Sequence, residues 1–129
     1  MGERKWRVLL VDDEPSIVKT VGKRLEVESY EVLIATDGQQ AIEIAKTARP
    51  DVIILDLMLP TINSFDICAQ IKQHQRSREI PIITVFSGKG SPDDEEKCRQ
   101  LGAAACVPKG QGAKPLINQI KALLQKTAH

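Results

Sequence analysis

Five short aliphatic runs alternate with segments of helical periodicity, and this alternation restricts the fold more than any other feature of the sequence. The runs lie at 8–11, 32–35, 52–55, 82–86 and 105–107, and each has about the length of a buried strand. Strands and helices that alternate in this way imply right-handed crossovers and a mostly parallel sheet covered on both faces. The sequence therefore predicts an α/β, doubly wound fold.

The segments between the runs repeat apolar residues at helical spacing and carry helix start signals. Asp37 can cap the second helix because Gln40 follows three residues later, and Ser91, followed by Pro92 and two aspartates, opens the fourth. Gly22 inside the first helix costs about 1 kcal/mol relative to Ala. The apolar positions are Ile17, Val21 and Leu25; Ala41, Ala45 and Ala48; Phe65, Cys68 and Ile71; and Leu116, Ile117, Ile120, Leu123 and Leu124.

Length and composition are those of one globular domain. With 129 residues, of which 42% are hydrophobic and 27% charged, we expect a single domain over 1–129 with its core at about 7–124. Lys and Arg total 18 against 17 Asp and Glu, so a net charge of +1 creates no field that would gather nucleic acid or coat an anionic membrane. We therefore expect no direct contact with nucleic acid or with a membrane.

Cysteine usage and hydropathy point to the cytoplasm. The three cysteines, Cys68, Cys98 and Cys106, form no C-x-x-C pair, and we interpret them as packing residues in a reducing compartment. No apolar stretch approaches the roughly 20 residues that span a bilayer, and the first residues lack a signal-peptide core. The expected localisation is cytoplasmic.

Polar side chains stand at the ends of four of the five expected strands. Asp12 and Asp13 follow the first strand, Asp56 ends the third, Ser87 follows the fourth and Lys109 follows the fifth. In open parallel sheets the ligand site lies beyond the carboxyl ends of the strands, where the strand order reverses. If the order is 2-1-3-4-5, the first and third strands are neighbours, and the three aspartates share one cleft.

Three carboxylates in one cleft need a counter-charge. Two carboxylates about 4 Å apart repel by roughly 4 kcal/mol at an effective dielectric constant of 20. Magnesium takes one or two carboxylates and fills its octahedron with water and phosphate oxygens, which matches this set of groups. A carboxylate can also attack phosphorus to form an aspartyl phosphate, a reaction that depends mainly on positioning and charge neutralisation. The pattern favours Asp56 as the nucleophile, with Ser87 and Lys109 donating to the phosphoryl oxygens.

The segments that carry this chemistry resemble the receiver domains of two-component response regulators. They are V-D-D-E-P at 11–15, L-D-L-M-L-P at 55–60, Ser87, and Lys109 preceded by L-G-A at 101–103. The resemblance extends from about Arg7 to Leu124. It implies a flavodoxin-like (βα)5 doubly wound parallel sheet with strand order 2-1-3-4-5.

The resemblance also implies roles for individual residues. Asp13 and Asp56 would bind Mg²⁺ directly, Asp12 would hold it through water, and the backbone carbonyl of Met58 would complete the protein ligands. Asp56 would be the phosphoacceptor, and Ser87 and Lys109 would hold the phosphoryl oxygens. The domain would turn over no external substrate and would catalyse only its own phosphorylation and dephosphorylation.

Partners follow from the same resemblance. The phosphodonor would be a sensor histidine kinase, a phosphotransfer protein or a small phosphorylated molecule. The output partner is unknown and would bind the surface of the fourth helix, fifth strand and fifth helix. A phosphorylation-linked homodimer through the fourth and fifth elements is a further hypothesis.

The chain departs from the family pattern at four places. It has N-S at 63–64 where the family usually has Asp-Gly, and Cys106 where an aromatic residue commonly stands. Gly follows the lysine in the P-K-G segment at 108–110, where the family commonly has Pro, and the segment 85–90 is bulkier and richer in glycine than usual. These differences concern the shape of the loop after Asp56, the usual coupling of the hydroxyl to an aromatic switch, and the way in which Lys109 is presented.

Other interpretations stay open at this point. Asp12 and Asp13 could cap the helix that begins near Pro15, Ser87 could only form a turn, and Lys109 could be solvated. The whole chain could be a phosphorylation-independent interaction domain of the same fold. A flavin or nucleotide binder is disfavoured because an acidic loop after the first strand repels phosphate, and an aspartyl phosphatase is disfavoured because position 58 is Met rather than a second carboxylate.

Overall fold

The computed structural model describes residues 5–56, 64–86, 96, 99–108 and 113–127. Its elements are β1 (Arg7–Val11), α1 (Pro15–Val27), β2 (Glu31–Ala35), α2 (Gly38–Thr47), β3 (Val52–Asp56), α3 (Ser64–Gln73), β4 (Ile82–Phe86), β5 (Ala105–Pro108) and α5 (Lys114–Thr127). All paired strands are parallel, and the sheet order is β2-β1-β3-β4-β5. The predicted fold class and strand order are confirmed.

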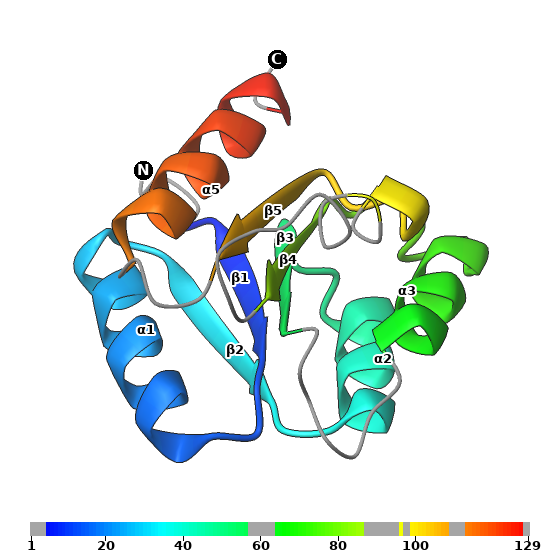
Figure 1. Cartoon of the computed structure of the whole chain (residues 1–129), viewed down its shortest axis with the longest axis horizontal. Helices are drawn as coiled ribbons and strands as arrows, with labels where there is room; N and C mark the ends of the chain where they lie inside the picture. Colours follow the sequence, from blue (N-terminus) through cyan, green and yellow to red (C-terminus); the bar gives the residue numbers. More distant parts are fainter. Residues whose placement is uncertain (1–4, 57–63, 87–95, 97–98, 109–112, 128–129) are drawn as a thin grey trace.

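Helices cover both faces of the sheet, with α1 and α5 on one side and α2 and α3 on the other (Figure 1). Side chains alternate along each strand, so each central strand supplies both cores. Leu9 and Leu55 are fully buried in the core beneath α2 and α3, whereas Leu10 and Ile54 belong to the core beneath α1 and α5. Because both faces of the central strands are covered, the sequences of these strands are continuously apolar.

The second helix begins as its sequence predicts. Asp37 is the N-cap of α2, and its carboxylate accepts a hydrogen bond from the Gln40 backbone N–H at 2.8 Å. The Gln40 side-chain oxygen accepts in turn from the backbone N–H of Thr36 at 2.9 Å. The cap therefore fixes both the start of α2 and the turn that leads into it.

The first helix ends in a Schellman motif built without glycine. The Tyr30 N–H donates to the Leu25 carbonyl at 3.1 Å, and the Ser29 N–H donates to the Glu26 carbonyl at 2.9 Å. Tyr30 and Leu25 are both buried in the core beneath α1 and α5, which supplies the apolar contact of the motif. Ser29 occupies the position where glycine is usual and has a φ of 71°.

The remaining expectations at the level of the fold concern the fourth helix and membrane-spanning segments. The predicted helix opening at Ser91 lies largely outside the described residues, and of its length only Glu96, Arg99 and Gln100 are described as helical. In the described part of the chain, no helix combines the length and the apolar character that crossing a membrane requires.

Candidate functional site

Asp12 and Asp56 lie next to each other at the carboxyl-terminal edge of the sheet. β1 and β3 pair in parallel with Val11 opposite Leu55, so the residue that follows each of these reaches the same level. Both aspartates are only 3% exposed. The reversal of strand order thus brings two buried carboxylates together where such sheets usually bind ligands.

Asp12 holds the loop after β1 rather than capping α1. Its backbone N–H donates to the Ala35 carbonyl at 3.0 Å, which continues the pairing of β1 with β2. Its carboxylate accepts from the backbone N–H of Glu14 at 3.0 Å. Glu14 is itself the N-cap residue, makes no side-chain cap, and precedes a proline at the first helical position. The helix-cap interpretation of Asp12 is therefore wrong.

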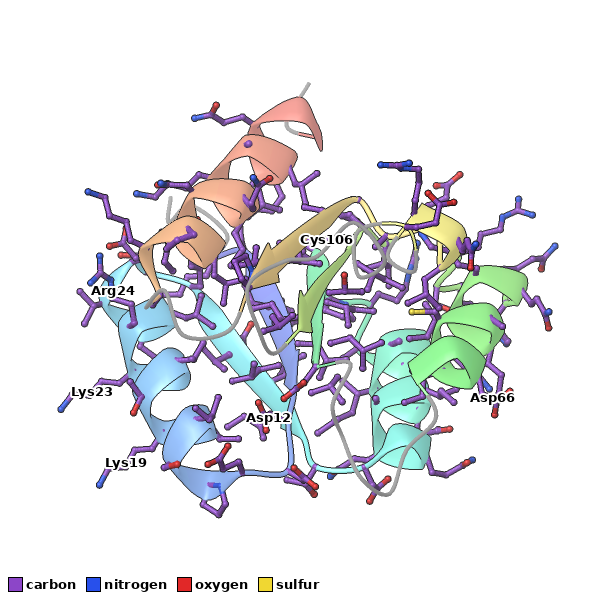
Figure 2. The ribbon with its side chains drawn as sticks, viewed as in Figure 1. Asp12, Lys19, Lys23, Arg24, Asp66 and Cys106 are labelled. Atoms are coloured by element: carbon purple, nitrogen blue, oxygen red, sulfur yellow. The ribbon has the colours of Figure 1, made fainter. Side chains whose placement is uncertain are left out.

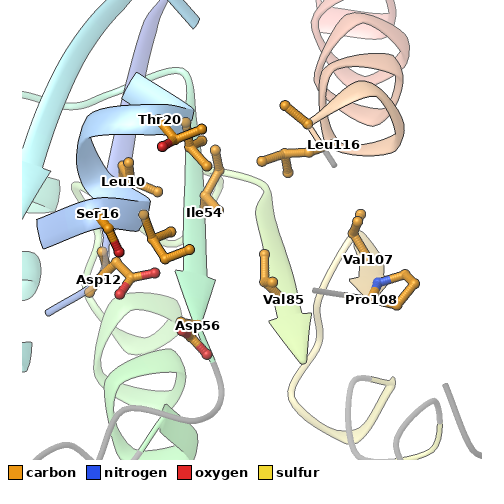
Figure 3. A pocket seen from close by; sticks show the side chains of 14 residues that line it. Leu10, Asp12, Ser16, Thr20, Ile54, Asp56, Val85, Val107, Pro108 and Leu116 are labelled. Carbon is orange, nitrogen blue, oxygen red and sulfur yellow. The ribbon is translucent and has the colours of Figure 1, made fainter. Parts of the chain in front are cut away.

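A cavity of about 290 Å³ opens beside the two carboxylates (Figure 3). Asp12 and Asp56 contribute its acidic lining, and Ser16 and Thr20 contribute hydroxyls from α1. The remaining lining is apolar and comes from the ends of the strands, from α1 and from the start of α5. Asp13 is exposed and is not among the described residues that line this cavity.

The donor set fits a hard cation that needs few protein ligands. Among the residues that the structure describes, no three His, Cys, Asp or Glu side chains are placed to hold one metal ion. Zinc in structural sites takes four protein ligands, which the described groups do not provide. Magnesium usually keeps several waters and takes one or two carboxylates, and the two buried carboxylates of Asp12 and Asp56 satisfy that requirement.

Three predicted site residues lie outside the described residues, namely Met58, Ser87 and Lys109. Each follows a described strand in the sequence, since β3 ends at Asp56, β4 ends at Phe86 and β5 ends at Pro108. Their roles in the site stay predictions, and so does the effect of the N-S segment at 63–64, of which Asn63 is also undescribed.

One contact behind the site was not predicted. Thr84 on β4 is fully buried, and its hydroxyl lies 3.3 Å from the sulfur of Cys106 and 3.4 Å from the carbonyl oxygen of Ala105. The register of β4 and β5 places Thr84 directly opposite Cys106. Cys106 is half-buried and contacts β4 through Thr84. It stands at the position where the family commonly has an aromatic residue. The sequence feature that could have indicated this contact is the hydroxyl of Thr84 within the otherwise apolar run at 82–86.

Cys68 is a packing residue, as predicted. It is 1% exposed in the core beneath α2 and α3, and burial raises the pKa of its thiol to about 11, against a smaller opposing effect of Lys72. A thiol with such a pKa is protonated at neutral pH and is a poor nucleophile. Cys68 and Cys106 are both free thiols.

Sequence comparisons agree with this geometry. The family described as the response regulator receiver domain matches residues 8–121. A probable transcriptional regulator, ycf27, of Guillardia theta is 36% identical over 125 residues, which are 97% of this chain and 48% of that protein. The DNA-binding dual master transcriptional regulator RpaA of Synechocystis is 31% identical over 121 residues, which are 94% of this chain and 50% of that protein. The chain thus spans about half the length of these relatives.

Solved structures share the fold over nearly the whole chain. The chemotaxis response regulator CheY4 of Vibrio cholerae has a TM-score of 0.84 and 28% identity, and the match covers 93% of this chain and 99% of that one. The receiver domain of a sensor histidine kinase from Pseudomonas aeruginosa has a TM-score of 0.84 and 25% identity, with 95% and 99% covered. That receiver domain is described with a magnesium ion coordinated in its active-site cleft.

The comparisons bear on two of the expectations. They do not favour a phosphorylation-independent interaction domain, since the family model that matches is that of the response regulator receiver domain. The expectation that the protein avoids nucleic acid is not supported, because relatives are named as transcriptional regulators and one as DNA-binding. The net charge of +1 is that of these 129 residues, which correspond to about half of each such relative. It therefore gives no information on nucleic-acid binding by the other half of those proteins. The chain belongs to the receiver domains of two-component response regulators, and it is a signalling module rather than a metabolic enzyme.

Proposed function

We propose that this receiver domain accepts a phosphoryl group on Asp56 in a magnesium-dependent reaction. The observation that supports the proposal is the burial of Asp12 and Asp56 side by side at the edge of the sheet, beside a cavity. Two carboxylates so placed repel each other, and a divalent cation held directly by Asp56 and through water by Asp12 would offset that repulsion. The magnesium ion described for the Pseudomonas receiver domain supports the choice of metal.

Asp56 and Asp13 would bind the ion directly, Asp12 would reach it through a water molecule, and the backbone carbonyl of Met58 would complete the protein ligands. When bound, Mg²⁺ supplies positive charge that offsets the carboxylates and the phosphoryl oxygens. The Asp12 carboxylate already accepts the Glu14 N–H, which fixes its orientation.

Asp56 would act as the nucleophile, with one carboxylate oxygen attacking phosphorus. It ends a strand whose four preceding residues are at most 2% exposed, so its backbone position is held by the core on both faces. Ser87 and Lys109 would donate hydrogen bonds to the phosphoryl oxygens. Such fixed donors and positive charges are what phosphoryl transfer mainly requires.

The phosphodonor would be a sensor histidine kinase, a phosphotransfer protein or a small acyl phosphate. Phosphorylation adds about 1.5 to 2 negative charges at the strand ends, which is enough to change nearby loops. The output surface would be formed by the fourth helix, β5 and α5. The names of the relatives support control of transcription as the output, and a phosphorylation-linked homodimer would form through the same surface.

We also propose that residues 1–129 form one domain, with a core at about 7–124. The cytoplasm is the proposed compartment, because the described cysteines Cys68 and Cys106 are free thiols.

Intact-mass spectrometry after incubation with acetyl phosphate and MgCl₂ tests the proposal. We expect the mass of one phosphoryl group to be added, and we expect the gain to disappear with Asp56→Asn or with EDTA. Asp66→Asn is the matched control, since Asp66 is an exposed carboxylate on α3. Light scattering on the same samples measures dimerisation. Phosphorylation that persists in Asp56→Asn, or no gain by a folded wild-type protein, would contradict the proposal.

A further inference from the structure

Among the strands that the structure describes, none pairs with the outer edge of β2. The strand order places β2 at the end of the sheet. The Glu31 N–H donates to the Trp6 carbonyl at 2.9 Å, and the Ala35 carbonyl accepts from Asp12, so these two residues direct their backbone groups toward β1. Backbone direction alternates along a strand, which leaves the N–H and C=O groups of Val32 and Ile34 facing outward. Such an edge is a template for another extended chain.

A groove of about 780 Å³ runs along this edge, between β2 and α1. Its apolar lining comes from Val18 and Gly22 of α1 and from Val32 and Ile34 of β2. Ile34 is 42% exposed and is one of the two large hydrophobic residues that the described surface leaves open. The groove is therefore both apolar and accessible.

Lysines surround the groove. Lys5, Lys19 and Lys23 line it, and Figure 2 shows Lys19 and Lys23 projecting from the same side of α1. Two acidic residues, Glu26 and Glu31, also line the groove, but Glu31 is already paired with Arg7, whose Nε lies 2.8 Å from its carboxylate. The net charge around the groove is positive. An acidic partner is the complement of this rim.

Gly22 is a second sign that the groove is built for a partner. Glycine in a helix interior is unfavourable relative to alanine, so a packing reason is expected where it occurs. A Cβ placed on Gly22 meets no heavy atom within 4 Å beyond the helix's own backbone and chain neighbours. Packing within the domain therefore does not require glycine here. The missing side chain instead keeps the floor of the groove open.

We propose that an extended acidic peptide segment of a partner protein binds this groove by adding a strand to the free edge of β2. Its backbone pairs with Val32 and Ile34, an apolar side chain enters the space above Gly22, and its acidic residues contact Lys19 and Lys23. A nucleic-acid strand would use the lysines but neither the apolar floor nor the strand edge, which is why a peptide fits better. The inference is independent of phosphorylation at Asp56.

Fluorescence anisotropy with a labelled peptide, Asp-Asp-Val-Thr-Val-Thr-Asp-Asp, tests the proposal on the full chain. Lys19→Glu combined with Lys23→Glu replaces two attractive contacts to the acidic peptide by two repulsive ones, so binding should weaken by about tenfold. Arg78→Glu is the matched control, because Arg78 is exposed and lies beyond α3, and it should leave the affinity unchanged. Gly22→Leu should also abolish binding by filling the floor, and Gly22→Ala serves as the variant that keeps the helix intact if the larger side chain disturbs folding.

Backbone pairing is tested separately with the same peptide methylated on the backbone nitrogens of all four central residues, which removes the donors on both lateral sides of the strand. We expect this peptide to lose most of its affinity, since N-methyl groups remove the donors that a strand needs. Equal binding of the methylated peptide, equal binding of a thymidine octanucleotide, or no binding of any probe at millimolar concentration would overturn the proposal. A doubled mass in light scattering without peptide that reverts to the monomer mass in Gly22→Leu would also overturn it, because a second copy would then occupy the groove beside β2.

Discussion

Replacing Ser29 by glycine should stabilise the domain, because Ser29 stands in a backbone conformation that favours glycine. Its φ of 71° lies in the left-handed region, and it directly follows the C-cap residue Glu28, where the Schellman motif usually has glycine. The Cβ of a non-glycine residue in this region costs roughly 1 to 2 kcal/mol. Glycine in turn loses more backbone entropy on folding, which offsets about 0.5 to 1 kcal/mol of that gain.

The expected net gain for Ser29→Gly is therefore about 0.5 to 1 kcal/mol in the free energy of unfolding. Urea unfolding followed by circular dichroism measures it. With a slope of about 1.5 kcal/mol per molar, the midpoint should rise by about 0.3 to 0.7 M. The two backbone hydrogen bonds of the motif are made by Ser29 and Tyr30 main-chain groups, so the substitution leaves both intact.

Ser29→Ala is the control for this prediction. Alanine keeps the Cβ and removes only the hydroxyl of an exposed residue, so its unfolding free energy should stay within about 0.5 kcal/mol of wild type. Arg49, with a φ of 49° after the end of α2, offers an independent second site for the same change to glycine. If Ser29→Gly and Ser29→Ala unfold at the same urea concentration, the reasoning from the left-handed backbone is refuted.

Three further perturbations have directions that follow from the structure. Gly22→Ala should raise the free energy of unfolding by up to about 1 kcal/mol in urea titrations, because a Cβ there meets nothing within 4 Å, and an unchanged midpoint would count against this. The hydrogen bond and the charge of Lys121 lower the pKa of the Glu28 carboxyl below its ordinary value of 4.5, so the pair contributes stability above that pH and loses it as the pH falls through the lowered pKa. Thermal melts of Glu28→Gln and wild type should accordingly differ at neutral pH and converge in acid, whereas a constant difference would exclude the carboxylate as the cause. Ile120→Ala should destabilise the domain by about 2 to 5 kcal/mol by calorimetry, because Ile120 is a fully buried residue of α5, and a loss below about 1 kcal/mol would mean that α5 is loosely packed.

The strands were predictable because of how completely this sheet is buried. Residues 52–55 of β3 are at most 2% exposed, and a strand buried on both faces must be apolar at every position. The proximity of Asp12 and Asp56 followed from the strand order, since Asp12 follows β1, Asp56 ends β3, and these two strands pair. The start of α2 was predictable because its cap uses residues only three apart, Asp37 and Gln40.

Features that depend on exact backbone position were not predictable in the same way. Whether Asp12 caps α1 or holds the preceding loop depends on which residue begins the helix, a difference of one or two positions. Ser29 carries no mark of its left-handed conformation, since serine is common in ordinary turns. The contact between Thr84 and Cys106 depends on the register of β4 against β5, which apolar runs alone do not specify.

The strand order also determines when the two carboxylates meet during synthesis. β2, β1 and β3 all lie within residues 7–56, so both aspartates belong to the half of the chain that leaves the ribosome first. The three strands can pair before β4, β5 and α5 exist to cover them. If they pair at that stage, Asp12 and Asp56 come together while water and salt still screen their repulsion, before the second half of the chain packs on. A nascent chain that folds in this order assembles the two like charges before their surroundings are dry.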